Sequence, residues 1–175
     1  MTREQPEHVL RAAAAIAQEN SLVVVGSQAI LLPFPNAPEA LLASREVDLY
    51  PAMHPERADL IDGAIGALSS FDETFGYHAD GVGPETAVMP DDWMDRARLY
   101  YIGDVTAICP DVHDLAVSKC AAGRKDADFV RVLLKEKMID PETLDQRLQQ
   151  LDPARHAVAG LRAWARRRGA EAAAP

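Results

Sequence analysis

Two carboxylates stand two residues apart in the segment Glu46-Val47-Asp48-Leu49-Tyr50. Side chains of a strand alternate between its faces, so Glu46 and Asp48 would lie on one face, with Cα atoms roughly 6.6–7 Å apart. Two such carboxylates repel each other unless a cation lies between them, and Mg²⁺ binds through a few carboxylates together with substrate phosphates. The segment therefore predicts either a magnesium-binding strand or a solvated strand face with ordinary surface acids.

The pair Gly26-Ser27 follows a continuous apolar run at residues 21–25 and begins a short segment with helical character. Backbone N–H groups at such a helix start favour an anion, and glycine permits the close approach of a phosphate. The other interpretation is a strand-to-helix turn with Ser27 as N-cap.

Two charged residues fall within the apolar stripe of a helical segment over residues 112–137. At about 100° per residue, Lys119 and Asp126 lie in the middle of that stripe, and isolated buried ions cost several kcal/mol. The pattern leaves three interpretations: a buried Lys119–Asp126 ion pair, a helix break at Gly123 that turns Asp126 outward, or an ammonium that contacts a substrate phosphate. The stripe consists of Val112, Leu115, Ala116, Gly123, Val130, Leu133 and Leu134.

Gly26-Ser27 followed by Glu46-Val47-Asp48-Leu49 resembles the signature of the nucleotidyltransferase superfamily, which includes DNA polymerase β and the minimal nucleotidyltransferases. The stretch from Asp114 through Lys119 to Asp126 is similar to the helical motif of its abortive-infection toxin branch. Gly81-Val82-Gly83-Pro84, with the later Trp93 and Arg96, looks like uncharacterised prokaryotic proteins grouped with that branch. The resemblance covers roughly residues 20–135.

The resemblance implies a site and a reaction. Glu46 and Asp48 would hold Mg²⁺ or Mn²⁺, although the superfamily usually has Asp at the first position. A third metal acid is expected on a later strand, and Asp80 is our choice because it alternates onto the same face as His78, with Asp104 second. Gly26 and Ser27 would bind the triphosphate. Arg45 is a further nucleotide-binding candidate, because Leu42 occupies the position where the toxin branch carries an arginine.

In that scheme Asp48, Lys119 and Asp126 are the catalytic residues, and a nucleoside monophosphate passes from a nucleoside triphosphate to an acceptor hydroxyl on RNA, such as tRNA, or on protein. The resemblance also implies the toxin half of a toxin–antitoxin or phage-defence pair, with a cognate antitoxin. The alternatives are a catalytically degenerate member that acts as a binding module, and a metal-dependent phosphohydrolase.

Charge is distributed unevenly along the 175 residues. Residues 46–95 hold twelve acids and one base, Arg57, whereas residues 153–170 hold five arginines and no acid. An acidic surface repels phosphates, which argues against general nucleic-acid binding. The basic segment predicts a solvated helix face, or a face that contacts the acidic region or an RNA acceptor. The first residues lack the order of a secretion signal and no apolar run is long enough to span a membrane, so we expect a cytoplasmic protein without membrane contact.

Hydrophobic periodicity predicts an α+β fold, a nucleotidyltransferase-like mixed sheet flanked by helices and followed by a helical C-terminal third. We expect a core over residues 1–109, a helical region over 110–168 packed on it as one compact unit, and a flexible tail over 169–175. Strands are predicted at 21–25, 45–50, 75–79, 86–89, 96–102 and 105–108. Helices are predicted at 6–20, 26–32, 55–68, 110–122, 124–138, 141–150 and 153–168.

Overall fold

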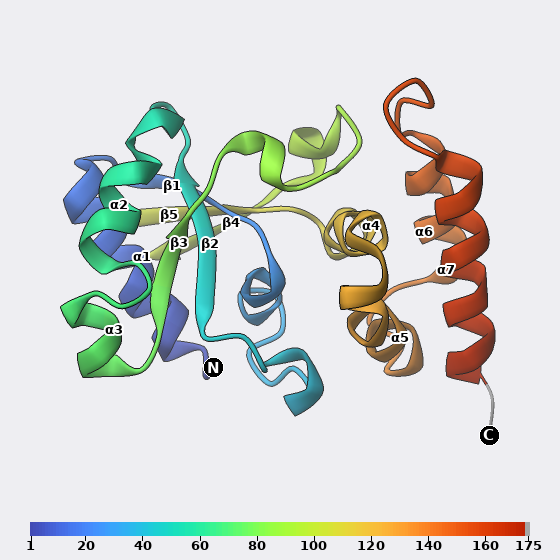
Figure 1. Cartoon of the computed structure of the whole chain (residues 1–175), viewed down its shortest axis with the longest axis horizontal. Helices are drawn as coiled ribbons and strands as arrows, with labels where there is room; N and C mark the ends of the chain where they lie inside the picture. Colours follow the sequence, from blue (N-terminus) through green and yellow to red (C-terminus); the bar gives the residue numbers. More distant parts are fainter. Residues whose placement is uncertain (174–175) are drawn as a thin grey trace. The chain divides into compact units, whose positions relative to one another are not determined.

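The computed structural model describes residues 1–173, except for the side chains of residues 124 and 125 (Figure 1). The predicted α+β class is confirmed: the described chain contains one five-stranded mixed sheet together with α-helices and short 3₁₀ helices. It divides into two compact units. The sheet unit comprises Met1–Ala87 and Ala97–Cys109, and the helical unit comprises Val88–Arg96 and the chain from Pro110 onward.

The sheet has the order β3-β2-β1-β5-β4. Its pairs β1–β5 and β2–β3 are parallel, and its pairs β1–β2 and β4–β5 are antiparallel. The predicted central strand is confirmed, because Leu22, Val23 and Val24 of β1 are fully buried in the middle of the sheet. The strands are β1 (Ser21–Val24), β2 (Glu46–Pro51), β3 (His78–Gly81), β4 (Arg98–Ile102) and β5 (Val105–Cys109).

Three α-helices contact the sheet, and Figure 1 shows them on the same side of β2 and β3. The inward residues of α1, Val9, Leu10 and Ala13, are completely buried, as are Val47 and Leu49 on the matching face of β2. The opposite face of β2 contacts the 3₁₀ helix η1 (Ser27–Leu31). The helices of this unit are α1 (Glu4–Ala17), α2 (Ala58–Ile65) and α3 (Ser70–Phe75), with short 3₁₀ turns η2 (Glu39–Leu41), η3 (Pro55–Arg57) and η4 (Pro84–Thr86).

The helical unit contains four α-helices, in which α7 packs against α5 and α6, and α4 packs against α5 and α6. Their apolar faces form a separate core that includes Leu133, Leu144 and Leu148. The helices are α4 (Val112–Ala122), α5 (Ala127–Lys135), α6 (Pro141–Gln149) and α7 (Val158–Ala173), with 3₁₀ turns η5 (Trp93–Arg96) and η6 (Gly123–Asp126). α7 includes residues 169–173 of the predicted tail, and residues 174–175 lie outside the described part.

Two strand predictions between β2 and β4 are wrong. Residues 86–89 form no strand, because Pro84 and Pro90 lack the N–H groups that a ladder needs and Pro84 starts the turn η4. Residue 75 ends α3 instead of starting a strand. Ser69 caps that helix by accepting a hydrogen bond from the Asp72 N–H, and Gly76 ends it with a φ of 75°.

Candidate functional site

The turn after β1 brings Gly26 against Asp48. The Val25 N–H donates to the Asp48 carbonyl oxygen (2.9 Å), which extends the β1–β2 ladder to the start of the turn. Gly26 then adopts φ 68° and ψ −171°, a conformation that is essentially restricted to glycine. A Cβ built on Gly26 would overlap the Asp48 carboxylate. The structure therefore brings together two candidates that are 22 residues apart in the sequence.

The segment that follows Gly26 is the five-residue 3₁₀ helix η1, and its N-cap is Gly26 with no side-chain cap. The interpretation of Ser27 as N-cap is therefore wrong, because Ser27 is the first residue of the helix. So short a helix has little macrodipole, and an anion here would depend on the backbone N–H groups of the turn itself.

The three acids proposed to bind metal share one face of the sheet. Glu46 and Asp48 alternate with the buried Val47 and Leu49 on β2. In the parallel β2–β3 pair, Glu46 stands opposite His78, and Asp48 stands opposite Asp80. Paired residues of neighbouring strands lie on the same face about 4.8 Å apart, so Asp80 is the lateral neighbour of Asp48. Asp104, the second choice, lies in the turn between β4 and β5, at the other edge of the sheet.

The surroundings of Asp80 at this acidic face disfavour its charged form. Burial raises the pKa of Asp80, and the negative charges of Glu46 and Asp62 raise it further, while His78 acts in the opposite direction. The charged form of Asp80 is disfavoured because like charges gather where water is partly excluded. A cation bound at this face would relieve that cost.

The carboxylates of β2 suit a magnesium ion that is shared with a substrate, but not a metal ion held by protein side chains alone. Among the described residues, no three His, Cys, Asp or Glu side chains converge closely enough to hold a metal ion. Mg²⁺ does not need such a cage, since it usually binds through one or two carboxylates and completes its shell with water and substrate phosphates. The pair Glu46 and Asp48 beside the Gly26 turn offers that smaller set. A metal role for Asp80 stays a prediction.

Arg45, predicted to bind nucleotide, makes contacts within the scaffold. Its Nε donates to the Gly76 carbonyl (2.6 Å) and its Nη2 donates to Asp72 Oδ1 (3.0 Å). The same Oδ1 lies 3.1 Å from His78 Nδ1. Arg45 thus belongs to an Asp72–His78 arrangement that adjoins the acidic face. From the sequence, no role was predicted for His78 or for Asp72, although His78-Ala79-Asp80 repeats the spacing of Glu46-Val47-Asp48.

Lys119 and Asp126 lie together in the helical unit. Lys119 Nζ is 3.6 Å from Asp126 Oδ1, and the two side chains are 12% and 15% exposed. α4 ends at Ala122, and Gly123 has φ 78°, so the predicted break occurs there as well. The break does not turn Asp126 away, because the 3₁₀ turn η6 returns it to Lys119. The Nζ atom also lies 5.3 Å from the Phe129 ring centroid, a cation–π distance. Catalytic roles for the pair stay a prediction.

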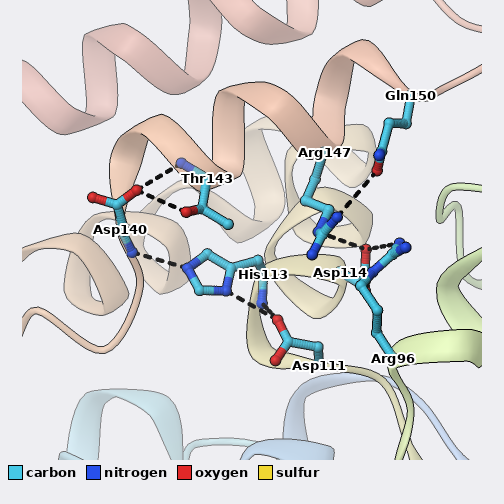
Figure 2. A network of polar contacts seen from close by, with 8 residues as sticks. All are labelled: Arg96, Asp111, His113, Asp114, Asp140, Thr143, Arg147 and Gln150. Atoms are coloured by element: carbon cyan, nitrogen blue, oxygen red, sulfur yellow. Dashed lines mark hydrogen bonds and ion pairs between the residues drawn. The ribbon is translucent and has the colours of Figure 1, made fainter.

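A network around the start of α4 ties residues 88–96 to the helices (Figure 2). Asp114 is completely buried and accepts two hydrogen bonds from Arg96, Nε to Oδ2 and Nη2 to Oδ1, both 3.0 Å. Arg147 Nε lies 3.8 Å from the same carboxylate, and Asp92 pairs with the other side of Arg96 (2.7 Å). The hydrogen bonds from Arg96 to Asp114 and to Asp92 raise the pKa of Arg96 above its usual value. Arg96 is thus a structural residue of the helical unit.

The basic face of α7 is partly neutralised within its own unit. Asp145 of α6 accepts from Arg162 (Nε 2.9 Å, Nη2 2.6 Å) and from Arg166 Nη2 (3.3 Å). These contacts, led by the hydrogen bond from Arg162, hold the pKa of Asp145 far below its usual value. Arg168 pairs with Glu171 on α7 itself. Three of the five arginines therefore have a partner inside the protein, which weakens the interpretation of this face as an RNA-binding surface.

The mixed sheet, with an acid pair on one strand beside a glycine turn at the end of its neighbour, is consistent with the nucleotidyltransferase class. Residues 7–160 match the family described as "Nucleotidyltransferase of unknown function (DUF6036)". The chain belongs to this family, which confirms the superfamily resemblance.

Other comparisons give no relative. No curated protein and no solved structure matches the chain. Within residues 1–173, every helix is too short or too polar to span a membrane.

Proposed function

We propose that this protein is a magnesium-dependent nucleotidyltransferase that moves a nucleoside monophosphate from a nucleoside triphosphate to an acceptor hydroxyl. The observation that carries the proposal is the contact of Asp48 with the Gly26 turn, with Glu46 and Asp80 on the same face. A triphosphate would lie on the turn's N–H groups, next to the carboxylates that would hold the metal ion.

In the proposed reaction, the acceptor oxygen forms a bond to the α-phosphorus. The bond from that phosphorus to the oxygen bridging it to the β-phosphate breaks, pyrophosphate leaves, and the hydroxyl proton passes to solvent in the net balance. Magnesium at Glu46 and Asp48 would supply charge neutralisation of the phosphates. We further propose that Lys119 stabilises negative charge on the phosphates and that Asp126 orients it.

The test is incubation with each α-labelled nucleoside triphosphate and Mg²⁺, with total RNA in one arm and cell protein in another. Asp48→Ala and Lys119→Ala are compared with the parent. Asp128→Ala is the matched control, because its carboxylate is 90% exposed and pairs with Arg131 on the surface of α5. Label transferred by the parent and the control, and lost in both site variants, supports the proposal. Transfer that is unchanged in Asp48→Ala refutes the site assignment.

One observation favours a second candidate, a non-catalytic binding module: the first acid of the signature is Glu46 where the superfamily usually has Asp. This candidate predicts no label transfer, whether or not the protein still binds nucleotide. Phosphate release from a γ-labelled triphosphate without any acceptor would instead indicate a phosphohydrolase.

The toxin role is part of the same proposal. Induced expression of an active toxin should arrest growth, and Asp48→Ala should relieve the arrest. Co-expression of neighbouring genes would then identify a cognate antitoxin as the one that restores growth.

A further inference from the structure

The strand β3 presents a second pair of functional side chains beside the acid pair of β2. His78 is the register partner of Glu46, and Asp80 is the register partner of Asp48. His78 is 14% exposed and lies close enough to Asp80 for its positive form to lower the pKa of that carboxyl. An imidazole therefore borders the carboxylates on the face where we place the metal ion and the triphosphate.

Asp72 fixes the ring of His78. Asp72 Oδ1 lies 3.1 Å from His78 Nδ1 and accepts from Arg45 Nη2, while its Oδ2 accepts from the Leu68 N–H (3.2 Å). These contacts, led by the backbone hydrogen bond from Leu68, lower the pKa of Asp72, so it is an ionised carboxylate that can only accept. The proton of a neutral His78 ring is consequently on Nδ1, which leaves a lone pair on Nε2.

The chain contains a second Asp–His pair that provides a comparison (Figure 2). His113 Nδ1 lies 2.9 Å from Asp111 Oδ1, and His113 Nε2 accepts a hydrogen bond from the Asp140 N–H (3.0 Å). Both nitrogens of His113 are therefore occupied, Nδ1 by the N-cap residue of α4 and Nε2 by the N-cap residue of α6. Among the described residues, His78 Nε2 has no such partner. The two pairs share one construction, but the one beside the acidic face keeps its acceptor nitrogen available.

We propose that His78 is a catalytic residue that accepts a hydrogen bond from the acceptor hydroxyl at Nε2 and holds that oxygen for attack, with Asp72 and Arg45 as positioning residues. The inference rests on the proposed nucleotidyltransferase function. It explains why a histidine, held in one tautomer, lies in register with Glu46. It also gives Arg45 a role through Asp72 in place of nucleotide contact.

Substitutions at His78 separate a hydrogen-bond acceptor from a packing group. Glutamine can place an amide oxygen near the Nε2 position, whereas asparagine reaches only the Nδ1 position. We expect His78→Asn to lower kcat for label transfer by about 100-fold or more, with the KM for the nucleotide unchanged within about twofold. His78→Gln should restore part of the loss. His113→Asn is the matched control, which should lower Tm and leave transfer intact.

A measurement of the tautomer gives a readout besides activity. With ¹⁵N-labelled histidine at alkaline pH, where the rings are neutral, His78 should show Nδ1 protonated and Nε2 bare in the parent, and a mixture of tautomers in Asp72→Ala. A predominant Nε2–H tautomer in the parent overturns the inference whatever the activity. If the parent transfers label and His78→Asn is equally active, the inference alone is wrong. If the parent transfers no label to any acceptor, the proposed function fails and the inference with it.

Discussion

Gly26→Ala tests the contact between the glycine turn and Asp48. The substitution has two consequences, because the backbone at φ 68° and ψ −171° disfavours any residue with a Cβ, and the new methyl would overlap the Asp48 carboxylate. The backbone conformation alone costs about 1–3 kcal/mol. For a chain of this size, each kcal/mol lowers Tm by about 2–4 °C. The overlap adds to this cost and moves the carboxylate.

The control is Gly103→Ala in the turn between β4 and β5. Gly103 also has a positive φ (62°), but a Cβ there would meet nothing within 4 Å. Both variants should lose stability through the backbone, and only Gly26→Ala should also lose Mg²⁺-dependent binding of a nucleoside triphosphate. Thermal unfolding and titration calorimetry measure the two effects.

A double-mutant cycle isolates the collision. In an Asp48→Ala background the carboxylate is absent, so Gly26→Ala should destabilise the protein less than it does in the parent, with a coupling within the range of about 0.5–3 kcal/mol seen for residues in contact. Additive effects, together with nucleotide binding by Gly26→Ala equal to that of Gly103→Ala, would refute the idea that the turn and Asp48 form one site.

Three further predictions concern charge. Asp114→Asn should lower the free energy of unfolding by about 1.5–3 kcal/mol in urea titrations, because Arg96 loses charge-assisted hydrogen bonds to a completely buried carboxylate while it keeps Asp92. Asp128→Asn, at a 90% exposed position, should change it by less than about 0.5 kcal/mol, and equal effects would contradict the assignment of Asp114 as a buried clamp. Asp145 has a lowered pKa, so its ion pairs with arginine stabilise the folded state fully at a pH above 3.8, the usual pKa of an aspartate. That stabilisation is lost as the pH falls below 3.8 toward the lowered pKa of the folded state. Asp145→Asn should therefore lower Tm at pH 7, and its Tm should approach that of the parent in acid; a constant difference across pH would argue against this ion-pair account. Asp80 has a raised pKa, so its ionisation opposes folding as pH rises above 3.8. Asp80→Asn should raise Tm at pH 7 in EDTA, and addition of Mg²⁺ should raise the Tm of the parent more than that of the variant.

The sequence patterns were most informative where one physical requirement dominated. Burial on both faces makes β1 a continuous β-branched run, and half-burial makes β2 alternate, so both strands could be predicted. The region between β2 and β4 was harder, because its structure depends on turns. A Ser69 cap and a left-handed Gly76 make residues 70–75 a helix and delay the strand that was predicted from residue 75 until His78.

In the candidate site, too, residues on strands could be placed from the sequence, whereas residues positioned by turns could not. Strand alternation was sufficient to place Glu46 and Asp48 on one face, and Asp80 on the face of His78. That these two faces coincide depends on the register of the β2–β3 pair, which the sequence does not determine. The partnership of Asp72 with His78 depends on the turn between α3 and β3, which no periodicity describes. For Lys119 and Asp126 the sequence left a break and an ion pair as alternatives, and the structure contains both, because the 3₁₀ turn after Gly123 reverses the displacement that the break introduces.

The interleaving of the two units along the chain restricts how the protein can be divided. Because residues 88–96 belong to the helical unit, the chain passes between the units three times, after residues 87, 96 and 109. A fragment beginning at Pro110 would contain the buried Asp114 without Arg96, its principal partner, and would leave that carboxylate with the weaker contact to Arg147 alone. Neither half is therefore an independent genetic module, and a single proteolytic cut at any one crossing leaves the two units covalently joined.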